Sequence, residues 1–192
     1  QAGGVRTYER HQQVGGEQDK DREVFLVLNG SVRINSISPG GRESIFSDLG
    51  VGDIFGELSA VDGLPRSATI VALTDCLLAR MSAAKFFDLL RENGVVSARL
   101  VQLLVTKIRR MSERVFEVSA LAVRERVRPE LLRLAVDGAR SGRAVVIQPG
   151  PAPSEIAPRL GSPAQPVPAD LRRLAQHGTL AEGARPRRPR LC

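Results

Sequence analysis

The apolar residues of this chain change their spacing once, close to Met81. Before Met81, short apolar runs are separated by turn residues. Residues 24–28 form one run, Asn29 and Gly30 are the commonest tight-hairpin signal, and residues 31–37 read as the return strand. An opening strand is predicted near residues 5–10, followed by a flexible loop. Strands at this spacing, with helical spacing after Met81, predict an α+β fold in which a β-barrel or β-roll precedes the helices.

A long helix is predicted from Val95 onward. Its apolar residues stand 3, 4, 3, 4 and 3 positions apart, and they are Val101, Leu104, Ile108, Met111, Val115 and Val118. An a/d seam of this kind, flanked by charged side chains, is typical of a two-stranded coiled coil. The alternative is that the stripe packs on the roll, but Leu100 and Leu103 supply a second apolar face for that contact. The sequence therefore favours a homodimer formed through this helix.

Charge is divided unequally along the 192 residues. Residues 1–94 hold 10 basic and 13 acidic residues, whereas residues 95–192 hold 18 basic and 8 acidic ones. A basic second half predicts a polyanionic partner such as DNA. Nine of the 12 prolines lie between Pro149 and Pro189, so this part of the chain is partly linker-like.

Other features argue against several classes of protein. Cys76 and Cys192 stand too far apart for a disulfide framework or a metal-binding spacing, and they suit a reducing cytoplasm. No apolar run reaches the ~18 residues that a membrane span needs. The two histidines, His11 and His177, are isolated, and no catalytic constellation stands out. We expect a cytoplasmic protein that is not an enzyme and that needs neither a metal nor a membrane.

The most specific segment is residues 55–69, with the sequence FGELSAVDGLPRSAT. Gly56 lets the backbone come close to a ligand, and the turn after it exposes N–H groups that can hold an anion. Glu57 suits a ribose hydroxyl, and Arg66 supplies the planar fork that suits a phosphate. The pair would match the two polar ends of a ribose phosphate. The alternative is that Glu57 and Arg66 form a structural ion pair in an empty roll.

This segment strongly resembles the phosphate-binding cassette of cyclic-nucleotide-binding domains. From about Val24 to Leu180 the chain follows the order of the cyclic AMP receptor protein (CRP/FNR) family of bacterial transcription regulators. The resemblance implies a cyclic-nucleotide-binding β-roll over residues 1–94 and a dimerisation helix over 95–118. It also implies a winged helix-turn-helix domain, possibly degenerate, with a basic Pro-rich tail over 119–192.

The resemblance also implies which residues bind the nucleotide. They are Gly56, Glu57, Leu58, Ser59, Arg66, Ser67, Met111 and Ser112. Glu57 would take the ribose 2′-hydroxyl, and Arg66 and Ser67 the cyclic phosphate. Ser112 agrees with the hydroxyl residues that meet adenine in the family's cyclic AMP sensors, whereas Met111 replaces such a hydroxyl. Cyclic GMP sites often have Thr where Ser67 stands, so cyclic AMP (cAMP) is favoured over cyclic GMP (cGMP).

The resemblance is weaker in the DNA-binding half. Residues 154–161 look like the first helix and turn of a helix-turn-helix, and the candidate DNA contacts are Arg159, Gln165, Arg172 and Arg173. At the positions that read bases, the family's Ser-Arg-Glu stretch and later Arg are replaced by Pro163, Ala164, Gln165 and Ala169. Pro166 and Pro168 would break a full-length recognition helix, so a shorter helix is expected from Pro168, with Asp170 in its first turn and Gly178 at its end.

Two functions from different classes follow. One is a homodimeric transcription regulator in which cyclic nucleotide binding is coupled to DNA binding. The alternative is a cyclic-nucleotide-binding dimer with impaired or lost sequence-specific DNA binding, acting through protein partners. A kinase or channel regulatory domain is disfavoured by the helix-turn-helix spacing. Family members have a helix and strands ahead of the position of Val5, so N-terminal or internal segments of the native protein can lie outside this sequence.

Overall fold

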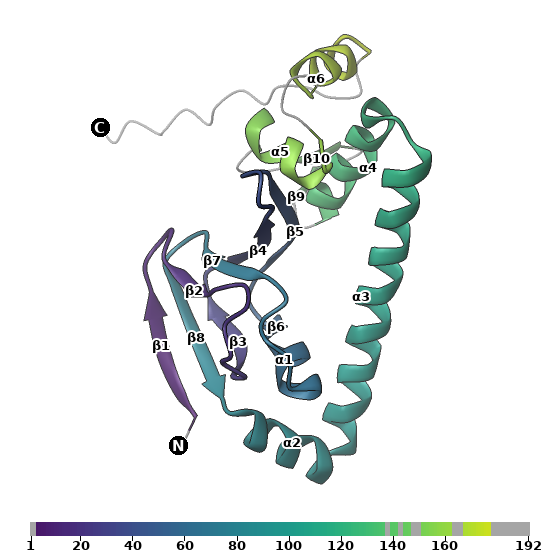
Figure 1. The fold of residues 1–192 in the computed structure, drawn as a ribbon. Helices are drawn as coiled ribbons and strands as arrows, with labels where there is room; N and C mark the ends of the chain where they lie inside the picture. The colour runs from purple at the N-terminus through teal and green to yellow at the C-terminus, as the bar shows by residue number, and fades with distance from the viewer. Residues whose placement is uncertain (1–2, 137–138, 142–143, 147–150, 163–166, 178–192) are drawn as a thin grey trace, which may run out of the picture. The chain divides into compact units, whose positions relative to one another are not determined.

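The computed structural model describes residues 3–136, 139–141, 144–146, 151–162 and 167–177. The chain divides into two compact units, Gln1–Glu113 and Arg114–Cys192. The elements of the first unit are β1 (Gly4–Tyr8), β2 (Gln13–Gly15), β3 (Val24–Asn29), β4 (Val32–Ile37), β5 (Glu43–Leu49), β6 (Ile54–Phe55), α1 (Glu57–Asp62), β7 (Thr69–Ala72), β8 (Cys76–Met81) and α2 (Ala83–Glu92). Helix α3 (Gly94–Ala120) begins in the first unit and ends in the second (Figure 1). The second unit continues with α4 (Val123–Val136), β9 (Ala139–Ser141), β10 (Ala144–Val146), α5 (Pro153–Arg159) and α6 (Val167–Gln176).

The first unit is a β-roll, one of the two architectures that the strand spacing predicted and the one that the family resemblance implied. Two antiparallel sheets, ordered β1-β8-β3-β6 and β2-β7-β4-β5, enclose one apolar core. Alternate side chains of a strand point to opposite faces, so each sheet directs one set of apolar side chains inward. The rings of Phe25 and Phe55 stack in this core with centroids 5.0 Å apart.

The predicted tight hairpin at Asn29 and Gly30 is wrong, although the turn itself is present. Strand β3 pairs with β8 and β6, whereas β4 pairs with β7 and β5, so the turn carries the chain from one sheet to the other. Gly30 does adopt a positive φ of 82°. The turn is held by Thr74, whose hydroxyl accepts a hydrogen bond from the backbone of Ser31 across 3.0 Å. The local signal identified the backbone conformation, but the long-range pairing decided which strands became neighbours.

Helix α3 buries none of its 27 residues within the single chain. Leu100 packs beside Val24, Ala60 and Phe86 of the first unit, as predicted for the second apolar face. Five of the six seam residues are 49–68% exposed, and they are Val101, Ile108, Met111, Val115 and Val118. An exposed apolar row of this length on one helix is suited to cover by another helix.

In the second unit, helices α4, α5 and α6 pack around Val127, Ile156, Leu160 and Val167. Pro129 lies inside α4. Helix α6 begins at Val167, close to the shortened helix expected from Pro168, and Asp170 lies in its first turn. Several predictions fall outside the described residues. They concern the base-reading positions Pro163, Ala164 and Gln165, the helix-breaking Pro166, the helix end at Gly178 and the basic tail. None of the described helices is long and apolar enough to cross a membrane.

Candidate ligand-binding site

Gly56 sits at the junction of β6 and α1, and only glycine suits it. It is the N-cap of α1 with a left-handed φ of 83°, which side chains other than glycine rarely adopt. A Cβ atom built on Gly56 would lie 2.3 Å from Nη1 of Arg66 and 2.4 Å from the carbonyl oxygen of Glu23. The backbone of Gly56 is therefore placed directly against the guanidinium of Arg66.

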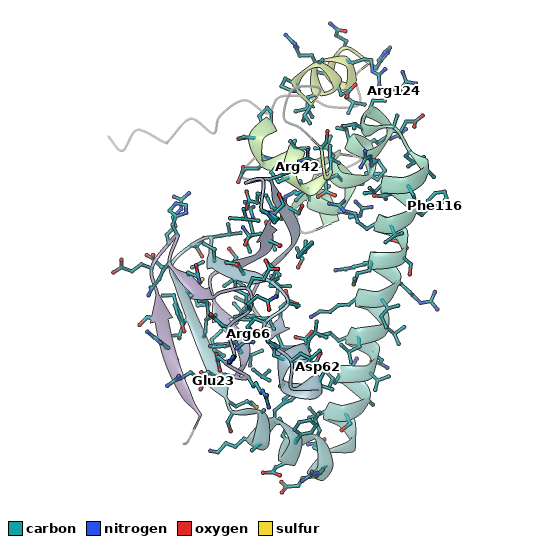
Figure 2. All side chains as sticks on the ribbon, viewed as in Figure 1. Glu23, Arg42, Asp62, Arg66, Phe116 and Arg124 are labelled. Carbon is teal, nitrogen blue, oxygen red and sulfur yellow. The ribbon has the colours of Figure 1, made fainter. Side chains whose placement is uncertain are left out.

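Arg66 is a buried cation with unused hydrogen-bond donors. It is 3% exposed, and its Nη2 donates to Oδ2 of Asp21 across 2.9 Å and to the carbonyl oxygen of Glu23 across 2.8 Å. Figure 2 labels Arg66 and Glu23 close together within the first unit. Its guanidinium carbon lies 5.5 Å from the centroid of the Phe25 ring. Nε and Nη1 are buried and have no partner among the described residues. Because an unpaired buried donor is costly, these two groups are suited to an anion such as a phosphate.

The segment from Gly16 to Glu23 is fixed to the cassette, whereas the sequence predicted a flexible loop. The backbone N–H of Gln18 donates to the carbonyl of Arg66, and the N–H of Arg66 donates to the carbonyl of Asp19, both across 2.9 Å. These two bonds hold Asp21 beside the guanidinium of Arg66.

Glu57 is a buried carboxylate at the start of α1. It is 2% exposed, and its Oε1 accepts a hydrogen bond from Nζ of Lys107 across 2.6 Å. Lys107 lies on α3, so the pair joins the cassette to the long helix. The proposed Glu57–Arg66 ion pair is absent among the described residues, because Glu57 pairs with Lys107 and Arg66 with Asp21.

The other residues predicted to bind the ligand differ in how far they are buried. Ser59 is buried, whereas Leu58 and Ser67 are exposed. Met111 is 67% exposed on α3, and the hydroxyl of Ser112 donates to the carbonyl of Ile108 on its own helix. Within the described part of the chain, no hydrogen bond or ion pair joins Met111 or Ser112 to the cassette. Their contact with a base therefore stays a prediction.

Sequence reasoning missed Asp21, Glu23 and Lys107. One signal was available for Lys107, because it follows Leu100 and Leu103 at helical spacing and so shares the face predicted to meet the roll. Asp21 carried no such signal. It meets Arg66 across 45 positions of sequence, through a loop whose path only the folded chain defines.

The candidate DNA contacts differ in exposure. Arg159 is 6% exposed and lies 3.8 Å from Glu130, so its side chain is engaged inside the second unit and is not free to meet a phosphate there. Arg172 is exposed on α6, and Arg173 is exposed beside Asp170 at 3.7 Å. Gln165 lies outside the described residues.

Comparisons with known proteins identify a family model and relatives that this chain resembles. The sequence model of the family described as "cyclic nucleotide-binding domain" matches residues 5–93. The CRP-like cAMP-activated global transcriptional regulator of Mycobacterium tuberculosis is 26% identical over 172 residues, which are 89% of this chain and 77% of that protein. The Cyclic AMP receptor protein of Thermus thermophilus is 29% identical over 178 residues, 93% of this chain and 80% of that one.

The fold is shared with a solved structure as well. FixK2 from Bradyrhizobium japonicum superposes with a TM-score of 0.80 over 96% of this chain and 90% of that chain, at 19% identity. At that identity the match concerns the fold alone.

Proposed function

The chain belongs to the CRP/FNR family of transcription regulators with a cyclic-nucleotide-binding domain, and on that premise we propose that it is a cytoplasmic homodimer whose binding to DNA responds to a cyclic nucleotide. It is a regulator and not an enzyme. We propose cAMP as the effector in preference to cGMP. The observation that carries the proposal is the pair of buried donors on Arg66, Nε and Nη1, that have no partner among the described residues, with Nη1 lying against Gly56.

The cyclic phosphate would be held by Nε and Nη1 of Arg66 and by the backbone at Gly56, with Ser67 beside them. Nη2 of Arg66 keeps its bonds to Asp21 and Glu23, so the guanidinium stays oriented while the phosphate uses its other donors. A ribose hydroxyl would donate to the carboxylate of Glu57. The anionic phosphate then meets the buried guanidinium of Arg66, and the ribose hydroxyl, a hydrogen-bond donor, meets the buried carboxylate of Glu57.

The Glu57–Lys107 pair gives the ligand a route to the long helix. A hydroxyl that donates to Glu57 competes with the ammonium group of Lys107 for the same carboxylate. Binding would therefore change how strongly α3 is held to the cassette. A ligand shifts a conformational equilibrium only through such differential contacts, so this pair is the candidate for coupling.

The homodimer is supported by the exposed seam of α3, which no part of the single chain covers among the described residues. DNA binding is supported by the helices α5 and α6 and by exposed cations such as Arg172. The alternative, a dimer that has lost sequence-specific reading, is favoured by one observation. The first three residues of α6 are Val167, Pro168 and Ala169, none of which can hydrogen-bond a base edge through its side chain.

The test is calorimetry of the full chain with cAMP and with cGMP, followed by gel shifts on duplex DNA at two salt concentrations. Saturable binding with cAMP preferred supports the sensor, and equal, millimolar-weak binding of both nucleotides overturns it. A cAMP-dependent, sequence-selective shift that persists at the higher salt supports the regulator. A shift that is lost with salt and ignores sequence supports the alternative.

A further inference from the structure

The loop that precedes β3 alternates acidic and basic residues, and only the acidic ones have partners. Residues 19–23 read Asp-Lys-Asp-Arg-Glu. The three carboxylates are engaged in turn by the backbone of Gly16, by Arg66 and by Arg80. The side chains of Lys20 and Arg22 are exposed, and neither forms a hydrogen bond or an ion pair with another residue in the described part of the chain. The loop therefore presents two cations that lack a counter-ion.

Lys20 and Arg22 line the same pocket, which we call the basic pocket. Its other wall is the turn after α1, residues 63–65, and its volume is about 330 Å³. The guanidinium of Arg22 lies beside Gly63: a Cβ atom built on Gly63 would lie 3.5 Å from Nη1 and 3.8 Å from Nη2. None of the residues predicted to bind the cyclic nucleotide is among those that line the basic pocket. The basic pocket therefore has a lining of its own, different from that of the site around Arg66.

The side chains of the basic pocket suit a phosphoryl group. Arg22 offers a planar fork of donors and Lys20 a compact charge with three donors, and together they match the several oxygens of a phosphate. No carboxylate is among the described residues that line the pocket, and Asp62 at the end of α1 accepts from the backbone N–H of Leu64 across 2.9 Å. The volume lies near the lower end of the range for small-molecule pockets, roughly 300–1,000 Å³, and accommodates a phosphate ester or a diphosphate.

The loop that carries these cations is also the loop that orients Arg66. The carbonyl of Arg66 accepts from the backbone N–H of Gln18 across 2.9 Å, and Asp21, which stands between the two cations in the sequence, pairs with its guanidinium. Gln18 adopts a φ of 69°, which residues other than glycine rarely adopt, so this loop holds a strained conformation. An anion bound to both Lys20 and Arg22 would hold together the two residues that flank Asp21 and so stabilise that conformation.

We propose that the basic pocket binds the phosphoryl group of a small ligand, a phosphate ester or a diphosphate, and that this anion strengthens the hold of the loop on Arg66. Lys20 and Arg22 are the binding residues. With the anion bound, the loop conformation in which Asp21 orients Arg66 is stabilised, and the affinity for the cyclic nucleotide rises. The effect on nucleotide affinity rests on the proposed function, whereas the anion site itself does not.

The first test is an NMR titration of the full, isotope-labelled chain with sodium pyrophosphate, at an ionic strength held constant with sodium chloride. Saturable changes are expected at the amide signals of residues 20–22 and of Gly63 and Leu64. The absence of saturable changes at these residues overturns the proposal. Changes confined to residues 56–59 and 66–67 also overturn it, because they would place the anion at the nucleotide site.

The second test removes charge in matched pairs. Lys20→Gln with Arg22→Gln takes both cations from the basic pocket. Arg10→Gln with Lys85→Gln is the control, because Arg10 and Lys85 are exposed, lie outside the pocket and have no ion pair among the described residues. The Kd for pyrophosphate is read from the amide signals of the turn, so that binding elsewhere on this basic chain does not contribute. It should rise by about tenfold or more in the first double variant and stay unchanged in the control. An unchanged Kd in both, or an equal rise in both, overturns the assignment.

The third test asks whether the two sites are coupled. Calorimetry measures the Kd for cAMP with saturating pyrophosphate and with sodium chloride of equal ionic strength. Pyrophosphate should lower this Kd about threefold or more in the wild type and leave it unchanged in the variant without Lys20 and Arg22. An unchanged Kd in the wild type overturns the coupling, and a Kd that rises as in competition shows that the two ligands share one site and overturns the proposal. If cAMP does not bind at all, the proposed function fails, and the nucleotide-free titrations still decide whether the basic pocket binds the anion.

Discussion

Lys107 on the long helix donates a hydrogen bond to Glu57 in the cassette across 2.6 Å, and the carboxylate that it meets is almost fully buried. This pair is the polar contact between the candidate ligand site and the helix that carries the seam. A buried carboxylate is costly without a cation or hydrogen-bond donor, so each member constrains the other.

Lys107→Gln is predicted to uncouple ligand binding from the long helix. The amide can still donate to Glu57 but carries no charge, so a ribose hydroxyl no longer has to displace a cation. We expect the Kd for cAMP to stay the same or to fall, and the cAMP-induced gain in DNA affinity to fall by about tenfold. Calorimetry and gel shifts measure the two quantities. Arg110→Gln makes the same charge change on the same helix and should alter neither; an unaltered gain in Lys107→Gln would contradict the prediction.

Arg66→Ala is predicted to abolish useful nucleotide binding. It removes the cation and both unused donors from the phosphate subsite, which should cost about 3 kcal/mol or more and so raise Kd by about a hundredfold. Arg66→Lys keeps the positive charge but not the planar fork of donors, so its affinity for cAMP should lie between those of the wild type and Arg66→Ala. Arg80→Lys, on β8 and paired with Glu23, is the control. Calorimetry that finds equal affinities for Arg66→Ala and the wild type would remove Arg66 from the site.

Gly56→Ala is predicted to damage both stability and binding. The positive φ and the 2.3 Å approach to Nη1 of Arg66 act together there, and the expected loss of unfolding free energy is roughly 1–3 kcal/mol. Gly41→Ala separates the two causes, because Gly41 also has a positive φ, of 76°, but open space around its Cβ position. Thermal melts should show a smaller loss for Gly41→Ala, and only Gly56→Ala should weaken cAMP binding. Equal effects on cAMP binding would show that the close contact is unimportant.

Ile108→Glu is predicted to dissociate the dimer without unfolding the monomer. Ile108 is 61% exposed in the single chain, so the charge costs little there, but a carboxylate inside a coiled-coil seam is strongly unfavourable. We expect the dimer Kd to rise by about a hundredfold or more in analytical ultracentrifugation. Thr106→Glu adds the same charge to an exposed position outside the seam and should leave the dimer intact. A dimeric Ile108→Glu protein would place the interface elsewhere.

The parts of the fold that the sequence predicted well are those set by local chemistry. The positive φ of Gly30, the long helix α3 and the start of α6 beside Pro168 all follow from a few adjacent residues. The pairing of strands does not. The turn at Gly30 could not reveal that β3 and β4 join different sheets, because that outcome depends on β7 and β8, which come about 40 residues later.

The same distinction applies to the site. Gly56, Glu57 and Arg66 were identified because they stand within one short segment of the right composition. Asp21 and Lys107, which orient the two charged groups, come from 45 and 50 positions away. Arg159 was assigned to DNA from its position in the pattern, and that role stays a prediction; nothing in the sequence signalled that Glu130, 29 positions earlier, lies 3.8 Å from it.

The uncovered seam of α3 has a consequence for a cell that contains two versions of this protein. In the proposed homodimer, this face would accept an intact and a defective copy equally, because Arg66 and Gly56 lie outside the seam. A binding-deficient copy made in excess would then draw intact copies into mixed pairs. Such an allele would suppress the response dominantly, and the strength of the response would depend on the ratio of the two gene products.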